Sequence, residues 1–133
     1  MAFNWEDFLI FAENINIAPD VPGPREAALR SAISRAYYAA FRAAMELGKQ
    51  NGFIATRSGD DHNKIREHFR NSKPKHQKKL DISVQLDRLH DLRRQADYEN
   101  SLKQKPENMA YNAIGMAKKV FQCINELSKP NSA

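Results

Sequence analysis

The stretch SAISRAYYAAF, residues 31–41, carries the pattern that decides the fold of this chain. It lies in a longer segment where small side chains recur every three or four residues: Ala28, Ala32, Ala36, Ala39, Ala40 and Ala43. That spacing places the alanines on one face of an α-helix, where a second helix can approach closely. Pro24 is suited to open this helix, and Asn51-Gly52 is a typical stop signal. We therefore predict a long helix from Pro24 to about Lys49 that packs closely against another.

A second pattern, LRRQADY, follows at positions 92–98. Its Arg93 and Asp97 are four residues apart, so that on a helix the guanidinium reaches the carboxylate. Tyr37 and Tyr38 are about 100° apart around their helix and cannot share a face. We expect one hydroxyl to bond to Arg93 or Asp97 and the other tyrosine to lie at an interface. Removing Asp97 would then leave a partly buried guanidinium uncompensated, at a cost of a few kcal/mol.

Together, the SRAYYAAF stretch and the later LRxxADY pattern resemble the HEPN superfamily, in one of its small prokaryotic branches, over about residues 5–127. The resemblance implies an all-α fold, an up-and-down bundle of four to five helices. It also implies a homodimer that pairs across the helix carrying the arginine. HEPN proteins are often encoded beside a nucleotidyltransferase-like partner that restrains them. The resemblance therefore implies a toxin–antitoxin or defence role in which the chain binds RNA, a nucleotide or a protein partner.

Hydrophobic periodicity in the rest of the chain predicts further helices of the same bundle. With the long helix, the expected segments are 4–16, 24–49, 62–70, 78–98 and 106–127. Asn4 is a plausible cap of the first helix, and Asp60 or Asp61 of the third. We expect a single domain over residues 1–133, with a core at about 4–128 and a disordered tail at 129–133.

Composition limits the possible environments and cofactors. No apolar run approaches the roughly 20 residues that cross a bilayer, and the N-terminal segment is acidic where a secretory signal is basic. The single Cys123, among apolar neighbours, predicts a buried thiol and a reducing cytoplasm. One cysteine does not support a zinc cluster, and the glycines lack the spacing of a phosphate-binding loop. We expect no metal, no cofactor and no membrane contact.

The net charge of +5 is concentrated in one window. Residues 57–79 hold eight basic and three acidic residues, whereas the other thirteen basic residues are matched by thirteen acidic ones. Such a patch attracts phosphate backbones and makes binding depend on salt. The candidate binding residues in it are Lys73, Lys75, Lys78 and Lys79. The alternative is an ordinary solvated surface, because only Phe69 is available there to stack on a base.

Active HEPN nucleases carry an arginine and, after four to six residues, a histidine that moves a proton during RNA cleavage. Arg93 matches this arginine, but Tyr98 stands where the histidine is expected. With an ordinary pKa of about 10, tyrosine is a poor general base at neutral pH. Arg57 and His62 also have this spacing, which arises easily by chance. The catalytic candidates are therefore Arg93, Asp97, Tyr98 and His62, and whether the chain is an enzyme stays open.

His62 is expected at the start of the short third helix, where this branch often has a histidine. It is either turned toward Tyr37, Tyr38 and Arg93 or an ordinary polar residue of a helix N-terminus. Ser34, Arg35, Tyr37 and Tyr38 are binding candidates, with structural support as the alternative role. The altered motif favours a dimeric binding module over a divergent, metal-independent ribonuclease.

Overall fold

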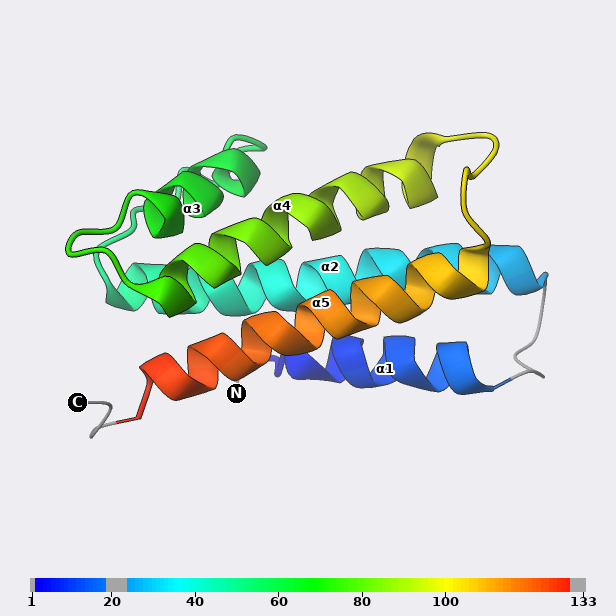
Figure 1. Ribbon diagram of the computed structural model, residues 1–133, viewed down its shortest axis with the longest axis horizontal. Coiled ribbons are helices and arrows are strands. Elements are labelled where there is room, and N and C mark those ends of the chain that lie inside the picture. Colours follow the sequence, from blue (N-terminus) through cyan, green and yellow to red (C-terminus); the bar gives the residue numbers. More distant parts are fainter. Residues whose placement is uncertain (1, 19–23, 130–133) are drawn as a thin grey trace.

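The computed structural model describes residues 2–18 and 24–129, which form five helices and no strand. The expected break at Pro19, Pro22 and Gly23 and the tail from residue 130 lie outside the described residues. The helices are α1 (Glu6–Ile17), α2 (Arg25–Gln50), α3 (Asp61–Arg70), α4 (Gln77–Tyr98) and α5 (Pro106–Leu127). Figure 1 shows α1, α2, α4 and α5 running along the long axis of the molecule, with the ten-residue α3 near one end. The predicted all-α bundle is confirmed.

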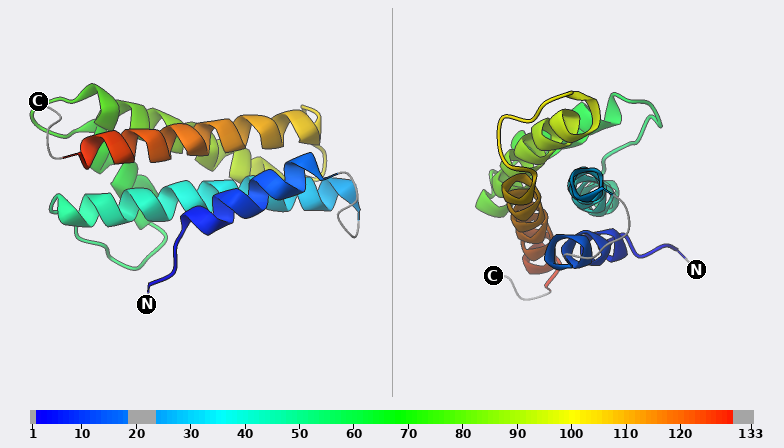
Figure 2. Two further views of the ribbon diagram at one scale, coloured as in Figure 1. Left: turned by 90° about the horizontal axis from the view of Figure 1, so that it is seen from below. Right: turned by 90° about the vertical axis from the view of Figure 1, so that its right-hand side faces the viewer.

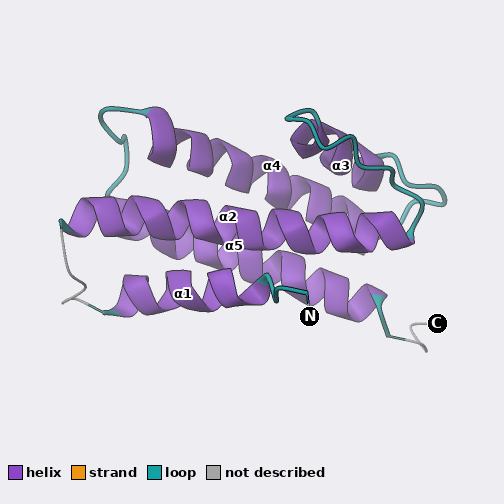
Figure 3. Ribbon diagram, turned by 180° about the vertical axis from the view of Figure 1, so that it is seen from behind, coloured by secondary structure: helices purple, strands orange, loops and turns teal. Residues whose placement is uncertain are grey.

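The long helix α2 is the centre of the bundle, because it contacts each of the other four helices. The end-on view in Figure 2 shows α5 between α1 and α4, with α2 on the other side. In Figure 3, α2 lies in front, with α1 below it and α3 and α4 above. Helix α1 packs against α2 and α5, whereas α3 packs against α2 and α4. Helices α1 and α3 do not contact each other, and the end-on view in Figure 2 shows no described helix on the side of α2 that faces away from α5.

The alanines of α2 do what their spacing predicts. Five of them have no exposed surface at all: Ala32, Ala36, Ala39, Ala40 and Ala44. Near the end of α2, Gly48 also allows close packing, and here even an alanine would be too large. A Cβ atom there would lie 2.6 Å from Cδ1 of Ile65 and 3.3 Å from Cβ of Phe53. The absence of a side chain at Gly48 thus lets α3 lie directly on α2.

Two arginines in the first turns of α2 hold the ends of neighbouring helices. Arg25 donates to the carbonyl oxygens of Ile15, Asn16 and Ala18, at 2.7 to 2.9 Å. Arg30 donates to those of Ala96, Glu99 and Asn100, at 2.6 to 3.4 Å. Carbonyls at a helix C-terminus lack partners within the helix and carry partial negative charge, so a cation stabilises them.

The helix caps differ in part from the expected ones. Asn4 lies two residues before α1, and its side-chain oxygen accepts from the N–H of Glu6 at 3.1 Å. Asp60 precedes α3, but its side chain makes no capping hydrogen bond. Asp61, the first residue of α3, is buried and bonds to the preceding loop instead. The carboxylate expected to cap α3 therefore organises the α2–α3 connection.

Candidate functional site

A polar cluster joins α2, α3 and α4 at the uncovered face of α2. The hydroxyl of Tyr37 hydrogen-bonds to Nδ1 of His62. Nη2 of Arg93 donates to the hydroxyl of Tyr38 at 2.6 Å. His62 therefore does turn toward the two tyrosines, which is one of the two orientations that the sequence left open. Both tyrosine hydroxyls have partners within the chain, although an interface was expected for one of them.

The Tyr37–His62 contact is enclosed by rings. Tyr37 is 1% exposed, and the imidazole stacks on Phe41 with ring centres 4.1 Å apart. Burial raises the pKa of Tyr37, and burial together with the charge of Arg93 lowers the pKa of His62. Tyr37 therefore keeps its proton and His62 is neutral near pH 7. We infer that Tyr37 donates to Nδ1, which leaves the proton of the neutral ring on Nε2. His62 then offers an N–H donor to a ligand.

The predicted contact between Arg93 and Asp97 is present as an ion pair, but Nε of Arg93 makes no hydrogen bond within the described part of the chain. Nε of Arg93 lies 3.3 Å from Oδ2 of Asp97, and the hydroxyl of Ser34 donates to the same oxygen at 3.4 Å. Tyr98 is different, because it is 72% exposed. Its ring centre lies 5.8 Å from the guanidinium carbon of Arg93, and it makes no hydrogen bond in the part of the chain described. Tyr98, which stands where the nuclease histidine is expected, thus contacts Arg93 only through its aromatic ring.

The sequence analysis missed His90, which belongs to the same cluster. Its ring centre is 5.7 Å from that of Tyr37 and 6.1 Å from that of His62. Burial, together with Arg66 and Arg93, lowers the pKa of His90 to about 4. The available signal was its position three residues before Arg93, which places the two on one face of α4.

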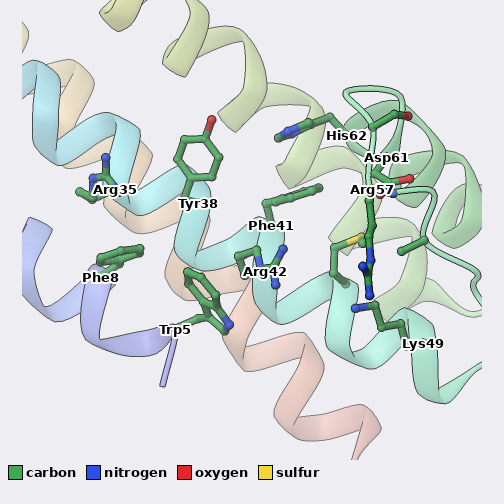
Figure 4. A pocket seen from close by; sticks show the side chains of 13 residues that line it. Trp5, Phe8, Arg35, Tyr38, Phe41, Arg42, Lys49, Arg57, Asp61 and His62 are labelled. Carbon is green, nitrogen blue, oxygen red and sulfur yellow. The ribbon is translucent and has the colours of Figure 1, made fainter. Parts of the chain in front are cut away.

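A pocket of about 870 Å³ adjoins this cluster (Figure 4). Its floor is a stripe of α2 from Arg35 to Lys49, in which lining residues recur every three or four positions. Trp5 and Phe8, at the start of α1, form one wall. The other wall is formed by the α2–α3 loop and the beginning of α3, including Arg57 and His62. The pocket therefore occupies the face of α2 that neither α1 nor α3 covers.

The pocket is strongly cationic. Four basic residues line it: Arg35, Arg42, Lys49 and Arg57. None of the four forms an ion pair with a carboxylate among residues 2–18 and 24–129. Two guanidinium groups lie over aromatic rings instead, Arg35 at 4.9 Å from the centre of Phe8 and Arg42 at 4.6 Å from that of Trp5. The positive charge is therefore not neutralised by the described residues.

Asp61 is the one acidic residue of the described chain that lines the pocket, and its carboxylate is occupied by the loop. It accepts from the N–H of Thr56 at 2.9 Å, from the Thr56 hydroxyl at 2.6 Å and from the N–H of Arg57 at 2.9 Å. These hydrogen bonds lower the pKa of Asp61. Arg57 has a φ of 61°, the left-handed region that costs a side chain about 1–2 kcal/mol. Asp61 thus fixes a strained backbone that carries one of the pocket cations.

The four candidate lysines do not join this site. Lys78 pairs with Glu126 of α5, and Nζ of Lys79 lies 3.3 Å from the hydroxyl of Ser72. Lys73 and Lys75 are exposed in the connection between α3 and α4, and none of the four lines the pocket. Among the other candidates, Arg35, Tyr38 and His62 line the pocket. The remaining candidates do not line it: Ser34, Tyr37, Arg93, Asp97 and Tyr98. The sequence analysis regarded the arginine–histidine spacing of Arg57 and His62 as a chance match, but Arg57 does line the pocket.

No group of three or more His, Cys, Asp and Glu side chains that could bind a metal ion occurs within 2–18 and 24–129. None of the helices described is long and apolar enough to span a membrane. The chain matches no protein-family model, no curated protein and no solved structure.

Proposed function

We propose that this chain is a HEPN-like RNA-binding module that holds the backbone of single-stranded RNA in the cationic pocket. The observation that carries the proposal is the set of four cations without carboxylate partners among the described residues: Arg35, Arg42, Lys49 and Arg57. Phosphates neutralise such charges and release counterions, which is the main source of affinity for nucleic acids. Aromatic rings beside a cationic groove are typical of proteins that bind single strands.

The polar cluster supports the same proposal. His62 lines the pocket, and its Nε2–H is a donor for a phosphate oxygen. Tyr38 also lines the pocket, and its hydroxyl accepts a hydrogen bond from Arg93. These donors add direction to the charge of the guanidinium groups, so that a phosphate is held at a defined place beside His62.

The test is fluorescence anisotropy with a labelled single-stranded RNA at several salt concentrations. Changing Arg42 and Arg57 to Gln should weaken binding and lower the log–log salt slope by about 0.7 for each phosphate that is no longer bound. The matched control changes Lys103 and Lys105 to Gln. It removes the same charge from the exposed α4–α5 connection, at the opposite end of the bundle from α3.

A third pair, Lys73→Gln with Lys75→Gln, tests the basic window that the sequence singled out. Our proposal expects this pair to behave like the control. Binding that survives the loss of Arg42 and Arg57 but falls with the two lysines would contradict the pocket as the RNA site.

A second candidate function is metal-independent RNA cleavage, and the meeting of His62, Tyr38 and Arg93 favours it. In that reaction the 2′-oxygen attacks phosphorus, and the bond to the 5′-oxygen breaks to leave a 2′,3′-cyclic phosphate. For this reaction His62 would use its other tautomer, in which Nδ1–H donates to Tyr37 and Nε2 takes the proton of the attacking 2′-hydroxyl. The resulting imidazolium would give that proton to the leaving 5′-oxygen, while Arg93, through Tyr38, would stabilise the charge on phosphorus. Incubation with RNA in EDTA, at a protein concentration that saturates binding for each variant, tests this: His62→Gln should abolish cleavage of the bound RNA. Cleavage that persists in His62→Gln would exclude this role.

We also propose that the protein forms a homodimer with its two-fold axis near α2 and α4, and that a nucleotidyltransferase-like protein is its partner in a toxin–antitoxin or defence system. The alanines of α2 that have no exposed surface pack within the bundle, so they do not supply a dimer interface. Its support is the exposed apolar surface of α1 and α4, which includes Ile10, Phe11 and Val84. Light scattering at high micromolar concentration should give the dimer mass, and a monomer mass would contradict it.

A further inference from the structure

The outer face of α5 carries a glycine that the fold of the chain does not require. Helix α5 packs against α1, α2 and α4, and Gly115 lies on its exposed side. A Cβ atom at Gly115 would have nothing within 4 Å. Glycine in the middle of a helix lowers stability relative to alanine, because it loses more conformational freedom on folding. Gly48 makes room for α3, whereas Gly115 has this cost with no neighbouring element of the described chain that needs the space.

An exposed aromatic ring lies one turn before this glycine. Tyr111 is 72% exposed, and residues four apart lie on the same side of a helix. A bulky side chain and a gap in the side-chain layer are therefore neighbours on one face of α5. Ile17 of α1, also largely exposed, adds apolar surface beside them. The ion pair between Glu13 and Lys118 sets this register, because α1 and α5 run in opposite directions (Figure 1).

The surface around Tyr111 and Gly115 is uncharged. Residues 108–117 contain no charged side chain, in a chain of which 28% of the residues are charged. Depletion of charge around an exposed tyrosine is typical of the centre of a protein–protein interface. Charges return at both ends of this stretch, with Glu107 before it and Lys118 after it. Glu107 has no ion-pair partner among residues 2–18 and 24–129.

The pattern on α5 is complementary to itself, so a second copy of the chain fits it. Two α5 helices can cross in opposite directions about a two-fold axis at the level of residue 113. Tyr111 of each copy then lies over Gly115 of the other copy. Glu107 of each copy lies opposite Lys118 of the other copy, so that opposite charges meet at both ends of the contact. A parallel crossing would instead place Tyr111 against Tyr111 and Glu107 against Glu107.

We propose that the outer face of α5 is a self-association surface, on which Tyr111 of each copy occupies the space above Gly115 of the other copy. This surface is separate from the two-fold axis proposed near α2 and α4. None of its residues lines the cationic pocket, so the inference does not depend on RNA binding. One pair of crossing helices buries less surface than a standard interface. We therefore expect a weak contact that forms at high protein concentration, in addition to the dimer.

Cysteine cross-linking tests the antiparallel register. The whole chain is prepared once with Glu107→Cys and once with Lys118→Cys, and the two are mixed with a short bis-maleimide. The native Cys123 is buried and should not react. Position 107 faces position 118 across the proposed contact. Two positions 107 are about 18 Å apart along the helix axis, so we expect roughly fivefold more mixed product than like-with-like product by intact mass.

Chance collisions are measured by mixing Glu107→Cys with Lys75→Cys, because Lys75 is exposed in the α3–α4 connection, outside α5. Gly115→Leu, added to both α5 cysteine variants, should reduce the mixed product to this collision level. The matched control is Gly59→Leu, at an exposed loop glycine with equally open surroundings, and it should leave the product unchanged. Mixed product no greater than like-with-like product would overturn the inference, as would cross-linking that Gly115→Leu leaves intact.

A smaller substitution separates association from folding. Gly115→Ala should raise the melting temperature of dilute protein, since alanine favours the helix, and should weaken the cross-linking at high concentration. A melting temperature that falls in dilute protein would show that the chain itself needs this glycine and would contradict the inference.

Light scattering of Gly115→Leu distinguishes the α5 surface from the dimer proposed above. An unchanged dimer mass, together with the loss of cross-linking, would support two separate surfaces. A change from dimer to monomer mass would support self-association through α5 and contradict the axis near α2 and α4.

Discussion

The hydroxyl of Tyr37 hydrogen-bonds to Nδ1 of His62, and this contact ties the short helix α3 to the centre of α2. Tyr37 has almost no exposed surface, and the imidazole is stacked on Phe41. The contact therefore has a structural effect, because it holds α3 in place, and a chemical one, because it occupies Nδ1 and leaves Nε2 as the other polar atom of the imidazole.

The first prediction tests that contact by removing the hydroxyl. Tyr37→Phe should lower the free energy of unfolding by about 1–2 kcal/mol, since it leaves Nδ1 of a partly buried imidazole without a donor. Urea denaturation measures the change. Tyr111→Phe, at an exposed tyrosine, should change stability by less than about 0.5 kcal/mol. In a His62→Leu background the effect of Tyr37→Phe should largely disappear, and an undiminished effect would contradict the coupling.

The second prediction concerns Asp61. Its removal should weaken RNA binding, although charge alone predicts that binding becomes stronger. Removing an acid from a cationic pocket should strengthen RNA binding electrostatically. Asp61→Ala also removes the acceptor that holds Thr56 and the strained backbone of Arg57, so we expect binding to weaken and the melting temperature to fall. Anisotropy and a thermal melt measure these effects.

The matched control for Asp61 is its neighbour Asp60, an exposed carboxylate whose side chain makes no capping hydrogen bond. Asp60→Ala should leave the melt unchanged and leave RNA binding equal or slightly stronger. If both variants strengthen binding equally, the loop contacts of Asp61 do not position Arg57.

The third prediction concerns pH. The pKa of His90 is about 4 in the folded protein, whereas the ordinary value of 6.5 applies to the unfolded chain. Between these values the unfolded chain binds a proton that the folded chain does not, so stability is complete above pH 6.5 and falls as the pH decreases toward 4. The pKa of His62 is also lowered in the folded protein, so this histidine adds to the decrease in stability. Urea denaturation at about pH 7, 6 and 5 should show a smaller decrease for His90→Gln. An identical pH dependence in the variant would contradict the assignment.

The fourth prediction concerns Asp97. Since its side chain is partly exposed and Arg93 keeps its hydrogen bond to Tyr38, we expect Asp97→Ala to cost about 0.5–1 kcal/mol. This is less than the few kcal/mol expected from the sequence alone. Arg93→Met should cost more, because it removes both the cation beside Asp97 and the donor to the Tyr38 hydroxyl. Thermal melts that rank the two variants in the reverse order would contradict this account.

Contacts within one helix were predictable from the sequence, whereas the pocket was not. Pro24 and Asn51-Gly52 predicted the ends of α2 to within about a residue, because these signals act on the local backbone. The same holds for Arg93 and Asp97, whose spacing of four residues fixes their distance. The pocket, by contrast, joins Trp5 to Arg57, and no periodicity relates residues from the first helix and a later loop.

The basic window shows why counting charges along a chain is a poor guide to a surface. Lys78 lies in that window, yet its ammonium pairs with Glu126 from the last helix, far away in the sequence. Arg35 and Arg42 lie outside the window, where acids and bases balance in number, yet neither pairs with a carboxylate of the described residues. Ion pairs form between neighbours in space, so the uncompensated charge is decided by helix packing.

The position of α3 determines not only the shape of the pocket but also the fraction of time for which the pocket is complete. This ten-residue helix touches only α2 and α4 among the helices described, with Ile65 and Phe69 as its main anchors in the core. A short element with few anchors detaches more often than the whole bundle unfolds. Each detachment removes His62 from Tyr37 and loosens the loop that carries Arg57. The pocket is therefore complete only for the fraction of time that α3 is docked, and the apparent dissociation constant of any occupant increases in inverse proportion to that fraction. Amide hydrogen exchange in α3, compared with that in α2, should slow when the occupant binds.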